Sequence, residues 1–224
     1  MPFDPTRVKA ICFDVDGTLS DTDDAWTALI DERLQRIKFL FPHQDPRPVA
    51  RWLVMASENP MNTVYRWLDA TSLDDNAARF YELMIKKRKH NPRRFWLMAG
   101  ARETLTILAE HFSLAVVSAR DELTTREFMA QFSLEDFFKA VVTLQTCEHT
   151  KPSPYPILWA AEHMGVAAQD CAIVGDTTED ILAGKAAGAQ TIGLLCGFGT
   201  ERELRRAGAD LILNNLKEIT NVLK

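Results

Sequence analysis

The sequence predicts an α/β protein with a doubly wound parallel sheet and an inserted all-helical module. Three observations predict this fold. Short apolar runs rich in β-branched residues recur along the chain, amphipathic stretches alternate with them through the second half, and a long stretch after the first run carries helical patterns alone. With 224 residues, the chain is long enough for one substantial core domain and a smaller second module.

The apolar runs are the predicted strands. They are short and continuous, as expected for strands that a parallel sheet buries on both faces. They cover residues 8–13, 114–117, 140–144, 172–174, 191–195 and 211–213. The predicted helices cover residues 100–111, 121–132, 154–164 and 179–187. Strand and helix therefore alternate, and this order favours parallel pairing through helical crossovers.

The stretch 21–97 breaks this alternation. Its helical patterns follow one another at about 23–39, 47–56, 62–68 and 74–89, with proline-bearing breaks between them. We expect residues 21–97 to form a helical cap domain, and residues 1–20 together with 98–224 to form the α/β core domain. Because the insertion follows the first strand, the residues that end this strand would lie at a hinge.

Composition and charge exclude several classes of protein. The formal net charge of -5, without a block of like charges, argues against nucleic-acid and membrane-surface partners. The four cysteines are widely spaced and form no C-x-x-C pair, so we expect neither a zinc site nor a disulfide framework. The N-terminus carries no secretory or membrane-spanning segment. These features predict a cytoplasmic protein, as a monomer or a homodimer.

The first predicted strand is followed directly by residues that could take part in catalysis or bind a ligand. Asp14 and Asp16 stand at its carboxyl end, where open α/β sheets bind ligands, and Gly17 permits a tight turn that brings backbone N–H groups to an anion. Two carboxylates held so close repel each other, and a hard divalent cation such as Mg²⁺ would remove that cost. Taken alone, the pattern is equally typical of a turn capped by aspartates.

Three further groups of residues that offer polar side chains or backbone donors follow later in the chain. Ser118 and Ala119 come after the second predicted strand, Lys151 stands before a proline, and Asp176 leaves the fourth strand with Asp180 one helical turn later. Each has an ordinary explanation when taken singly: a helix N-cap, a solvated surface cation and a capped helix start. Taken together, they restrict the possible functions more than any one of them does.

Together these pieces resemble the haloacid dehalogenase superfamily, whose members carry DxDGT, then Ser or Thr after a strand, then Lys, then an acidic GDxxxD. The stretches FDVDGTLSDT, KPSPYP and VGDTTEDILAGKAAGA resemble the helical-cap branch that includes phosphoglycolate phosphatase, β-phosphoglucomutase and phosphonatase. The resemblance covers nearly the whole chain and implies a Rossmann-like core. Each motif is weak alone, whereas the ordered set is specific.

The resemblance implies a catalytic role for each aspartate of the first motif. Asp14 would attack phosphorus and form an aspartyl-phosphate. Asp16 would protonate the leaving oxygen and later activate water. Mg²⁺ would be held by Asp14, the backbone carbonyl of Asp16 and Asp176.

The other motifs would bind the phosphoryl group. The resemblance implies that Ser118, the Ala119 N–H and Lys151 hold the phosphoryl oxygens. Asp180 would orient metal-bound water or Lys151 from behind, and neighbouring Glu179 either shares that role or is an exposed helix acid.

The implied substrate is a small-molecule phosphate ester, such as phosphoglycolate or a sugar phosphate. Asp16 argues against carbon–halogen cleavage, because the dehalogenases of this superfamily lack the second aspartate. A phosphomutase and a catalytically silent binding protein remain alternatives. Arg47, Arg51 and Arg66 of the predicted cap either bind an anionic part of the substrate or cover apolar surface. Arg120 either touches substrate or starts a helix.

Overall fold

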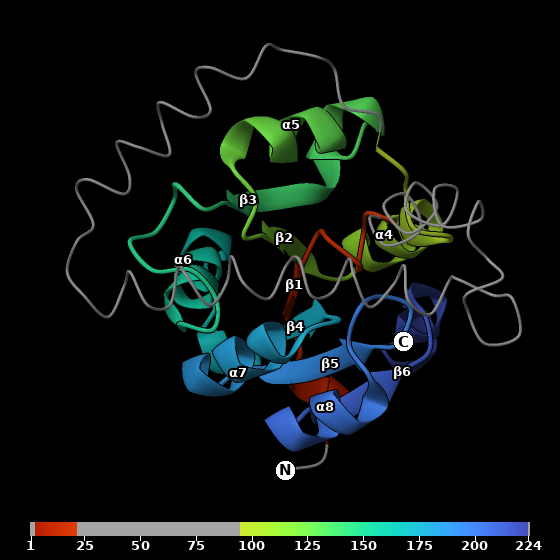
Figure 1. The fold of residues 1–224 in the computed structure, drawn as a ribbon. Coiled ribbons are helices and arrows are strands. Elements are labelled where there is room, and N and C mark those ends of the chain that lie inside the picture. The colour runs from red at the N-terminus through yellow and green to blue at the C-terminus, as the bar shows by residue number, and fades with distance from the viewer. Residues whose placement is uncertain (1–2, 22–94, 224) are drawn as a thin grey trace, which may run out of the picture. The chain divides into compact units, whose positions relative to one another are not determined.

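The computed structural model describes residues 3–21 and 95–223 (Figure 1). The chain divides into two compact units, one comprising Met1–Thr22 with Phe95–Lys224 and the other Asp23–Arg94. All described residues belong to the first unit. The helical character predicted for the cap, and the cap arginines, lie outside the described residues.

The described unit is built on a six-stranded parallel sheet with the order β3-β2-β1-β4-β5-β6. The strands are β1 (Ala10–Phe13), β2 (Ser113–Val117), β3 (Phe138–Val142), β4 (Cys171–Gly175), β5 (Gln190–Leu194) and β6 (Leu211–Leu213). The predicted doubly wound parallel sheet is confirmed for this unit. The strand order reverses beside β1, so the carboxyl ends of β1 and β4 form the crevice in which such sheets bind ligands.

Helices flank this sheet. The α-helices are α4 (Ala101–Ala109), α5 (Glu122–Gln131), α6 (Tyr155–Met164), α7 (Thr178–Ala187), α8 (Glu201–Ala207) and α9 (Ile219–Val222). Short 3-10 helices are η1 (Pro5–Arg7), η4 (Glu135–Phe137), η5 (Ala168–Asp170) and η6 (Leu216–Glu218). The first four α-helices were predicted, with ends that differ by at most two residues. Helices α8 and α9 were not predicted.

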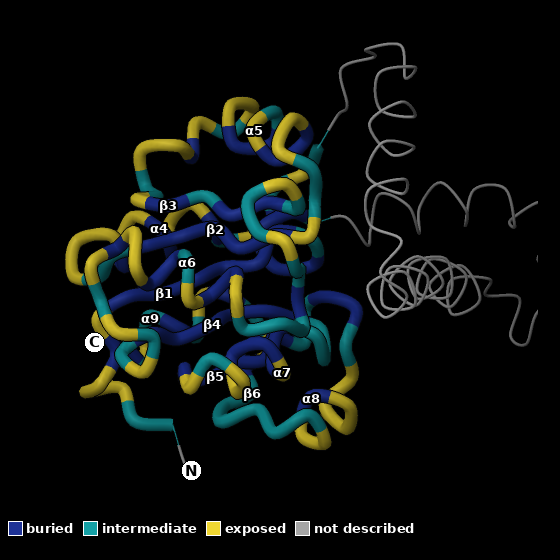
Figure 2. Tube along the Cα trace, turned by 90° about the vertical axis from the view of Figure 1, so that its left-hand side faces the viewer, coloured by how far each residue is buried: buried dark blue, intermediate teal, exposed yellow. Residues whose placement is uncertain are grey.

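The two faces of the sheet bury two separate cores, because successive strand residues point to opposite faces. In β1, Ile11 and Phe13 pack into the core beneath α4, α5 and α9, and Ala10 and Cys12 pack into the core beneath α6 and α7. Figure 1 shows α6 and α7 on the side of the sheet opposite α4. Figure 2 shows the central strands as buried along their length.

The two ends of the described unit that flank residues 22–94 lie side by side. The backbone N–H of Asp21 donates to the Trp96 carbonyl at 2.9 Å, and the N–H of Met98 donates to the Leu19 carbonyl at 2.8 Å. An inserted module enters and leaves a core in this way. Among the described helices, none has the length and apolar character needed to cross a bilayer.

Candidate active site

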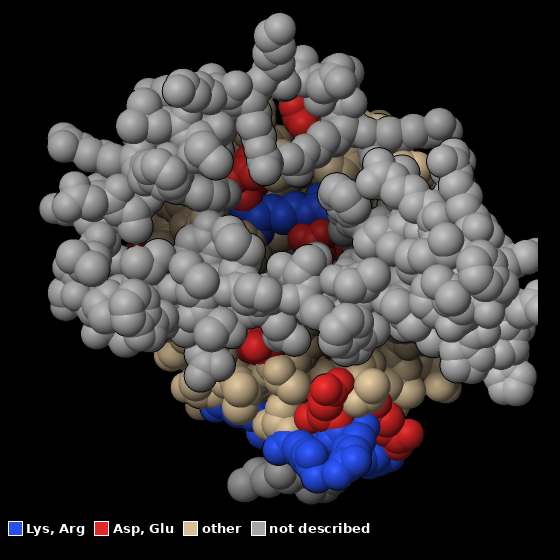
Figure 3. Space-filling model, viewed as in Figure 1, with Lys and Arg blue, Asp and Glu red and all other residues tan. Residues whose placement is uncertain are grey.

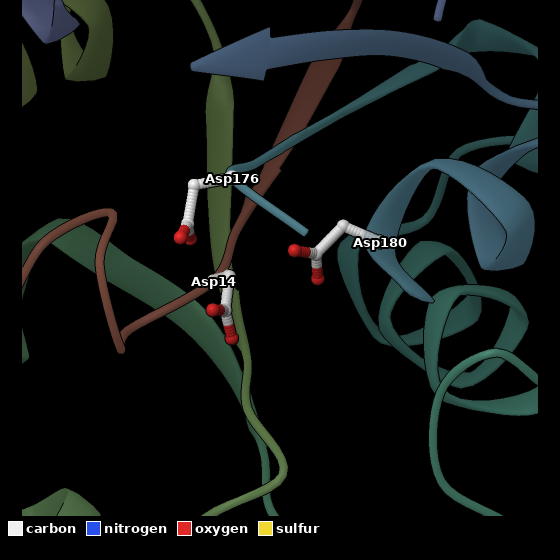
Figure 4. Close-up of side chains that lie close together, drawn as sticks. All are labelled: Asp14, Asp176 and Asp180. Carbon is white, nitrogen blue, oxygen red and sulfur yellow. The ribbon is translucent and has the colours of Figure 1, made fainter. Parts of the chain in front are cut away.

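Asp14 lies at the centre of the site because β1 is the central strand that ends there. Its backbone N–H still pairs with β4, donating to the Val174 carbonyl at 2.9 Å, and the residue is only 5% exposed. Figure 4 shows the side chains of Asp14, Asp176 and Asp180 close to one another. Each offers an oxygen within 4.8 Å of the others. The structure therefore gathers three predicted carboxylates from two segments of the chain, the end of β1 and the stretch that leads from β4 into α7.

The turn after Asp14 depends on Gly17. Gly17 has a φ of 74°, in the left-handed region that favours glycine. A Cβ atom at this position would lie 2.3 Å from Oδ2 of Asp176, so no other residue fits without displacing that carboxylate. The next residue, Thr18, donates its hydroxyl to Oδ1 of Asp176 at 2.9 Å. The turn thus connects the first motif to the last.

Lys151 is a buried bridge between two of these carboxylates. Its Nζ donates to Oδ1 of Asp14 and to Oδ1 of Asp180, each at 2.6 Å, and the residue is 9% exposed. Burial alone would lower the pKa of Lys151, but the two carboxylates together raise it above its ordinary value. The alternative of a solvated surface cation is therefore excluded.

Asp180 holds Lys151 and begins helix α7 at the same time. Its Oδ2 accepts hydrogen bonds from the Thr177 N–H at 3.1 Å and the Thr177 hydroxyl at 2.7 Å, while Thr177 caps the helix in return. Its Oδ1 accepts from Lys151. Glu179 instead accepts a hydrogen bond from Thr178. Of the two neighbouring acids, Asp180 is the one that reaches the site.

Asp176 is enclosed by the loop that follows β5. Its Oδ2 accepts a hydrogen bond from the Phe198 N–H at 2.7 Å. A Cβ atom at Gly197 would lie 2.2 Å from that oxygen, and one at Gly199 would lie 2.0 Å from the Asp176 carbonyl. This close approach explains the Gly-Phe-Gly sequence. Burial raises the pKa of Asp176 well above its ordinary value, and the charges of Asp14 and Asp180 raise it further.

The buried charges of this cluster do not balance. Among the described residues, Lys151 is the cation that forms ion pairs with Asp14 and Asp180. Burial raises the pKa of Asp14 to about 7 against the lowering effect of Lys151. A group of buried carboxylates with excess negative charge is the oxygen-rich environment that a hard divalent cation prefers. The cluster is therefore compatible with a divalent metal.

Ser118 directly follows β2, the strand next to β1. Its backbone N–H donates to the Val142 carbonyl at 2.9 Å, its hydroxyl accepts from the Arg120 N–H at 3.1 Å, and the residue is buried. The Ser118-Ala119 segment thus occupies the carboxyl end of the strand adjacent to that of Asp14. This position agrees with the predicted phosphoryl-binding role, which remains a prediction.

Asp16 points to a different partner. Its carboxylate forms an ion pair with Arg120, in which Nε of Arg120 lies 2.6 Å from Oδ2 of Asp16. The side chain of Asp16 is therefore not part of the cluster formed by Asp14, Asp176 and Asp180. The sequence does not predict this pair, because Arg120 belongs to none of the four motifs and lies 104 residues from Asp16. Figure 3 shows acidic and basic atoms together near the centre of the viewed face.

Comparison with known proteins gives concordant results. A family model for haloacid dehalogenase-like hydrolases matches residues 11–194. The chain is 26% identical to the pyrophosphatase PpaX of Halalkalibacterium halodurans and 27% identical to a phosphoglycolate phosphatase of Chromobacterium violaceum, with 97% of both chains covered in each case.

Solved structures agree on the fold. A hydrolase from Pseudomonas syringae superposes with a TM-score of 0.69 at 24% identity, covering 96% of this chain and 97% of that one. A putative β-phosphoglucomutase from Thermotoga maritima gives a TM-score of 0.63 at 22% identity, covering 96% and 98%. At these identities the likeness shows the fold alone. The family model, which spans most of the chain, confirms the predicted resemblance: this chain belongs to the haloacid dehalogenase-like hydrolases.

Proposed function

We propose that the protein is a Mg²⁺-dependent phosphatase that hydrolyses small-metabolite phosphate esters through an aspartyl-phosphate on Asp14. The observation that carries this proposal is the buried Asp14 carboxylate, oriented by Lys151 and placed beside Asp176 in a cluster with excess negative charge. The curated relatives named above, a pyrophosphatase and a phosphoglycolate phosphatase, support a phosphate-releasing reaction.

The reaction proceeds in two displacements. An oxygen of Asp14 attacks phosphorus, the ester P–O bond breaks, and Asp16 gives a proton to the leaving oxygen. Asp16 then takes a proton from water as that water attacks the phosphorus of the aspartyl-phosphate. The Asp14–phosphorus bond breaks, inorganic phosphate leaves and both carboxyl groups return to their starting states.

Lys151 serves both the nucleophile and the phosphoryl group. An ammonium group has three donors, and Asp14 and Asp180 accept two of them. The third is available for a phosphoryl oxygen, together with the Ser118 hydroxyl and the Ala119 N–H. Asp180 fixes the direction of Lys151 from the far side, and this contact favours the positioning role predicted for it.

The metal would be held by Asp14, Asp176 and the backbone carbonyl of Asp16. When bound, Mg²⁺ neutralises the charge that otherwise opposes the approach of a carboxylate to a phosphoryl group. The predicted cap would exclude water and select the leaving group.

A panel of esters tests the function. We expect Mg²⁺-dependent phosphate release from p-nitrophenyl phosphate, phosphoglycolate and a hexose phosphate, with chelator abolishing release from each. Pyrophosphate belongs in the panel because a relative bears that activity in its name. If no member of the panel releases phosphate with Mg²⁺, or if chelator leaves release unchanged, the proposal is wrong.

Asp176→Asn is expected to separate metal binding from folding. In metal-free protein the variant should melt roughly 2–4 °C higher, the shift that about 1 kcal/mol produces in a chain of this size, because a buried carboxylate is removed from a repulsive cluster. An asparagine can still accept from the Phe198 N–H and can donate to the Thr18 hydroxyl, so the hydrogen bonds persist.

The same variant should lose the response to Mg²⁺. Wild-type protein at about 100 times the dissociation constant gains roughly 2.7 kcal/mol, and the variant should gain almost none. Thermal melts with Mg²⁺ and with chelator measure both effects. Equal Mg²⁺-induced shifts in the two proteins would remove Asp176 from the metal site.

A further inference from the structure

Arg120 forms a bidentate ion pair with the Asp16 carboxylate. Its Nε donates to Oδ2 at 2.6 Å and its Nη2 donates to Oδ1. The same Nη2 lies 3.4 Å from the Ser20 hydroxyl oxygen. A guanidinium fork on a carboxylate is among the strongest side-chain pairings, and it fixes the orientation of the carboxylate as well as its position.

The arginine is the fixed member of this pair. Its guanidinium carbon lies 5.2 Å from the ring centre of Phe95 and 5.6 Å from that of Phe128, within cation–π range. Its backbone is held at both ends, since its N–H donates to Ser118 and its carbonyl accepts from Leu144. The Arg120 side chain is 13% exposed, whereas that of Asp16 is 29% exposed.

The bidentate ion pair conflicts with the role of Asp16 as a general acid in the reaction. That role belongs to the proposed function, so the inference rests on the proposed function. A guanidinium only donates hydrogen bonds, so both Asp16 oxygens act as acceptors while the pair is intact. To protonate a leaving oxygen, Asp16 has to turn one oxygen away from Arg120. Breaking this buried ion pair without putting another anion in its place carries a large free-energy cost.

We propose that Arg120 determines substrate specificity by exchanging Asp16 for a second anionic group on the leaving portion of the substrate. A carboxylate or phosphate on the leaving group takes the place of the Asp16 carboxylate on the guanidinium fork. Once released from the guanidinium, Asp16 takes up a proton from solvent water and gives it to the leaving oxygen as the ester P–O bond breaks. Because one anion replaces another, the guanidinium fork keeps an ion pair throughout.

The location of Arg120 fits this exchange. In the proposed reaction Asp16 acts on the leaving oxygen. Arg120 is in direct contact with Asp16, so a leaving group that meets Asp16 also comes close to the fork. Esters with an uncharged leaving group supply nothing to displace Asp16. They are therefore expected to react slowly, with the Asp16–Arg120 pair intact.

A matched pair of substrates tests the exchange. Phosphoglycolate and ethyl phosphate share a two-carbon leaving group and differ in one carboxylate, and pyrophosphate presents phosphate in its place. In Arg120→Met, kcat/KM for phosphoglycolate should fall by about 100-fold or more, as expected for the loss of a charge-assisted bidentate contact. For ethyl phosphate the fall in kcat/KM should be at least about 10-fold smaller. Arg120→Lys, which keeps the charge without the fork, should recover part of the loss.

The control is Arg126→Met, which removes an exposed arginine of α5 that pairs with Glu122. It should leave both substrates unchanged. An equal loss for phosphoglycolate and ethyl phosphate in Arg120→Met would overturn the exchange, since a purely structural arginine slows all substrates alike. A loss for pyrophosphate alone, or for phosphoglycolate alone, identifies which anion the fork accepts.

Binding separates this inference from the phosphatase proposal. In Asp14→Asn protein, titration calorimetry should show phosphoglycolate binding at least about 10-fold tighter than ethyl phosphate, and adding Arg120→Met should remove the difference. If wild-type protein hydrolyses no ester but this Arg120-dependent difference is found, the phosphatase proposal fails and the anion site stands. Equal affinities with and without Arg120 overturn the anion site, whatever the turnover.

Discussion

Replacing Asp14 by asparagine is expected to abolish metal-dependent phosphate release while leaving the fold intact. An amide has the shape of the carboxylate but is not a nucleophile toward phosphorus, so kcat should fall by roughly 10⁴-fold or more, as for other covalent catalysts that lose their nucleophile. The oxygen of the new amide would still accept the hydrogen bond from Lys151. The buried carboxyl group, whose pKa is raised to about 7, would be gone. The melting temperature of metal-free protein should therefore hold or rise.

A matched control makes this result specific. Asp136 is an exposed carboxylate in η4, on the segment before β3, and Asp136→Asn should leave both phosphate release and melting temperature unchanged. Residual Mg²⁺-dependent release by Asp14→Asn at more than about one-hundredth of the wild-type rate would place the nucleophile elsewhere.

Lys151→Met is expected to damage both stability and turnover. Methionine fills a similar volume but donates no hydrogen bond, so the buried Asp14 and Asp180 carboxylates lose the cation they share. Breaking a buried ion pair by removing one partner costs about 3–5 kcal/mol. The phosphoryl group also loses a charged donor, so kcat should fall by roughly 10³-fold. Urea unfolding and phosphate release measure the two effects separately.

Lys139→Met is the control for this change. Lys139 is an exposed lysine of β3 whose Nζ contacts the Ser113 hydroxyl, and its replacement should change stability by less than about 0.5 kcal/mol. If Lys151→Met kept wild-type stability and turnover, Lys151 would contribute neither to the stability of the fold nor to the reaction.

The sheet could be predicted because its strands are buried on both faces. Continuous apolar runs flanked by polar segments identified all six strands of the described unit, and the errors lie at their ends. Strand β3 begins at Phe138, two residues before the prediction, because the half-buried Phe138 already pairs with Leu114. Helix α8 was missed because its seven residues are mostly charged. The Thr200–Glu203 capping box was the available signal.

The site could be predicted only in part. Asp14, Lys151, Asp176 and Asp180 were predicted to share one site because motif order carries information that no single motif has. The structure brings their side chains together, and their chemical roles stay predictions. The Asp16–Arg120 pair was not predicted. It depends on how β1 and β2 align and on an aromatic recess formed by distant residues, and neither leaves a local pattern in the sequence.

The central claim is that a phosphoryl group passes through Asp14, and Asp16→Asn protein tests it most directly. An aryl leaving group needs little protonation, so the first displacement should proceed, whereas loss of the base should slow hydrolysis of the intermediate. The protein is mixed with Mg²⁺ and p-nitrophenyl phosphate that carries a radiolabel on phosphorus, and is then quenched in acid and digested. The label is predicted to lie on the peptide that contains Asp14, and hydroxylamine should remove it. Label on another residue, or p-nitrophenol release in a rapid burst with no labelled peptide, would contradict the account.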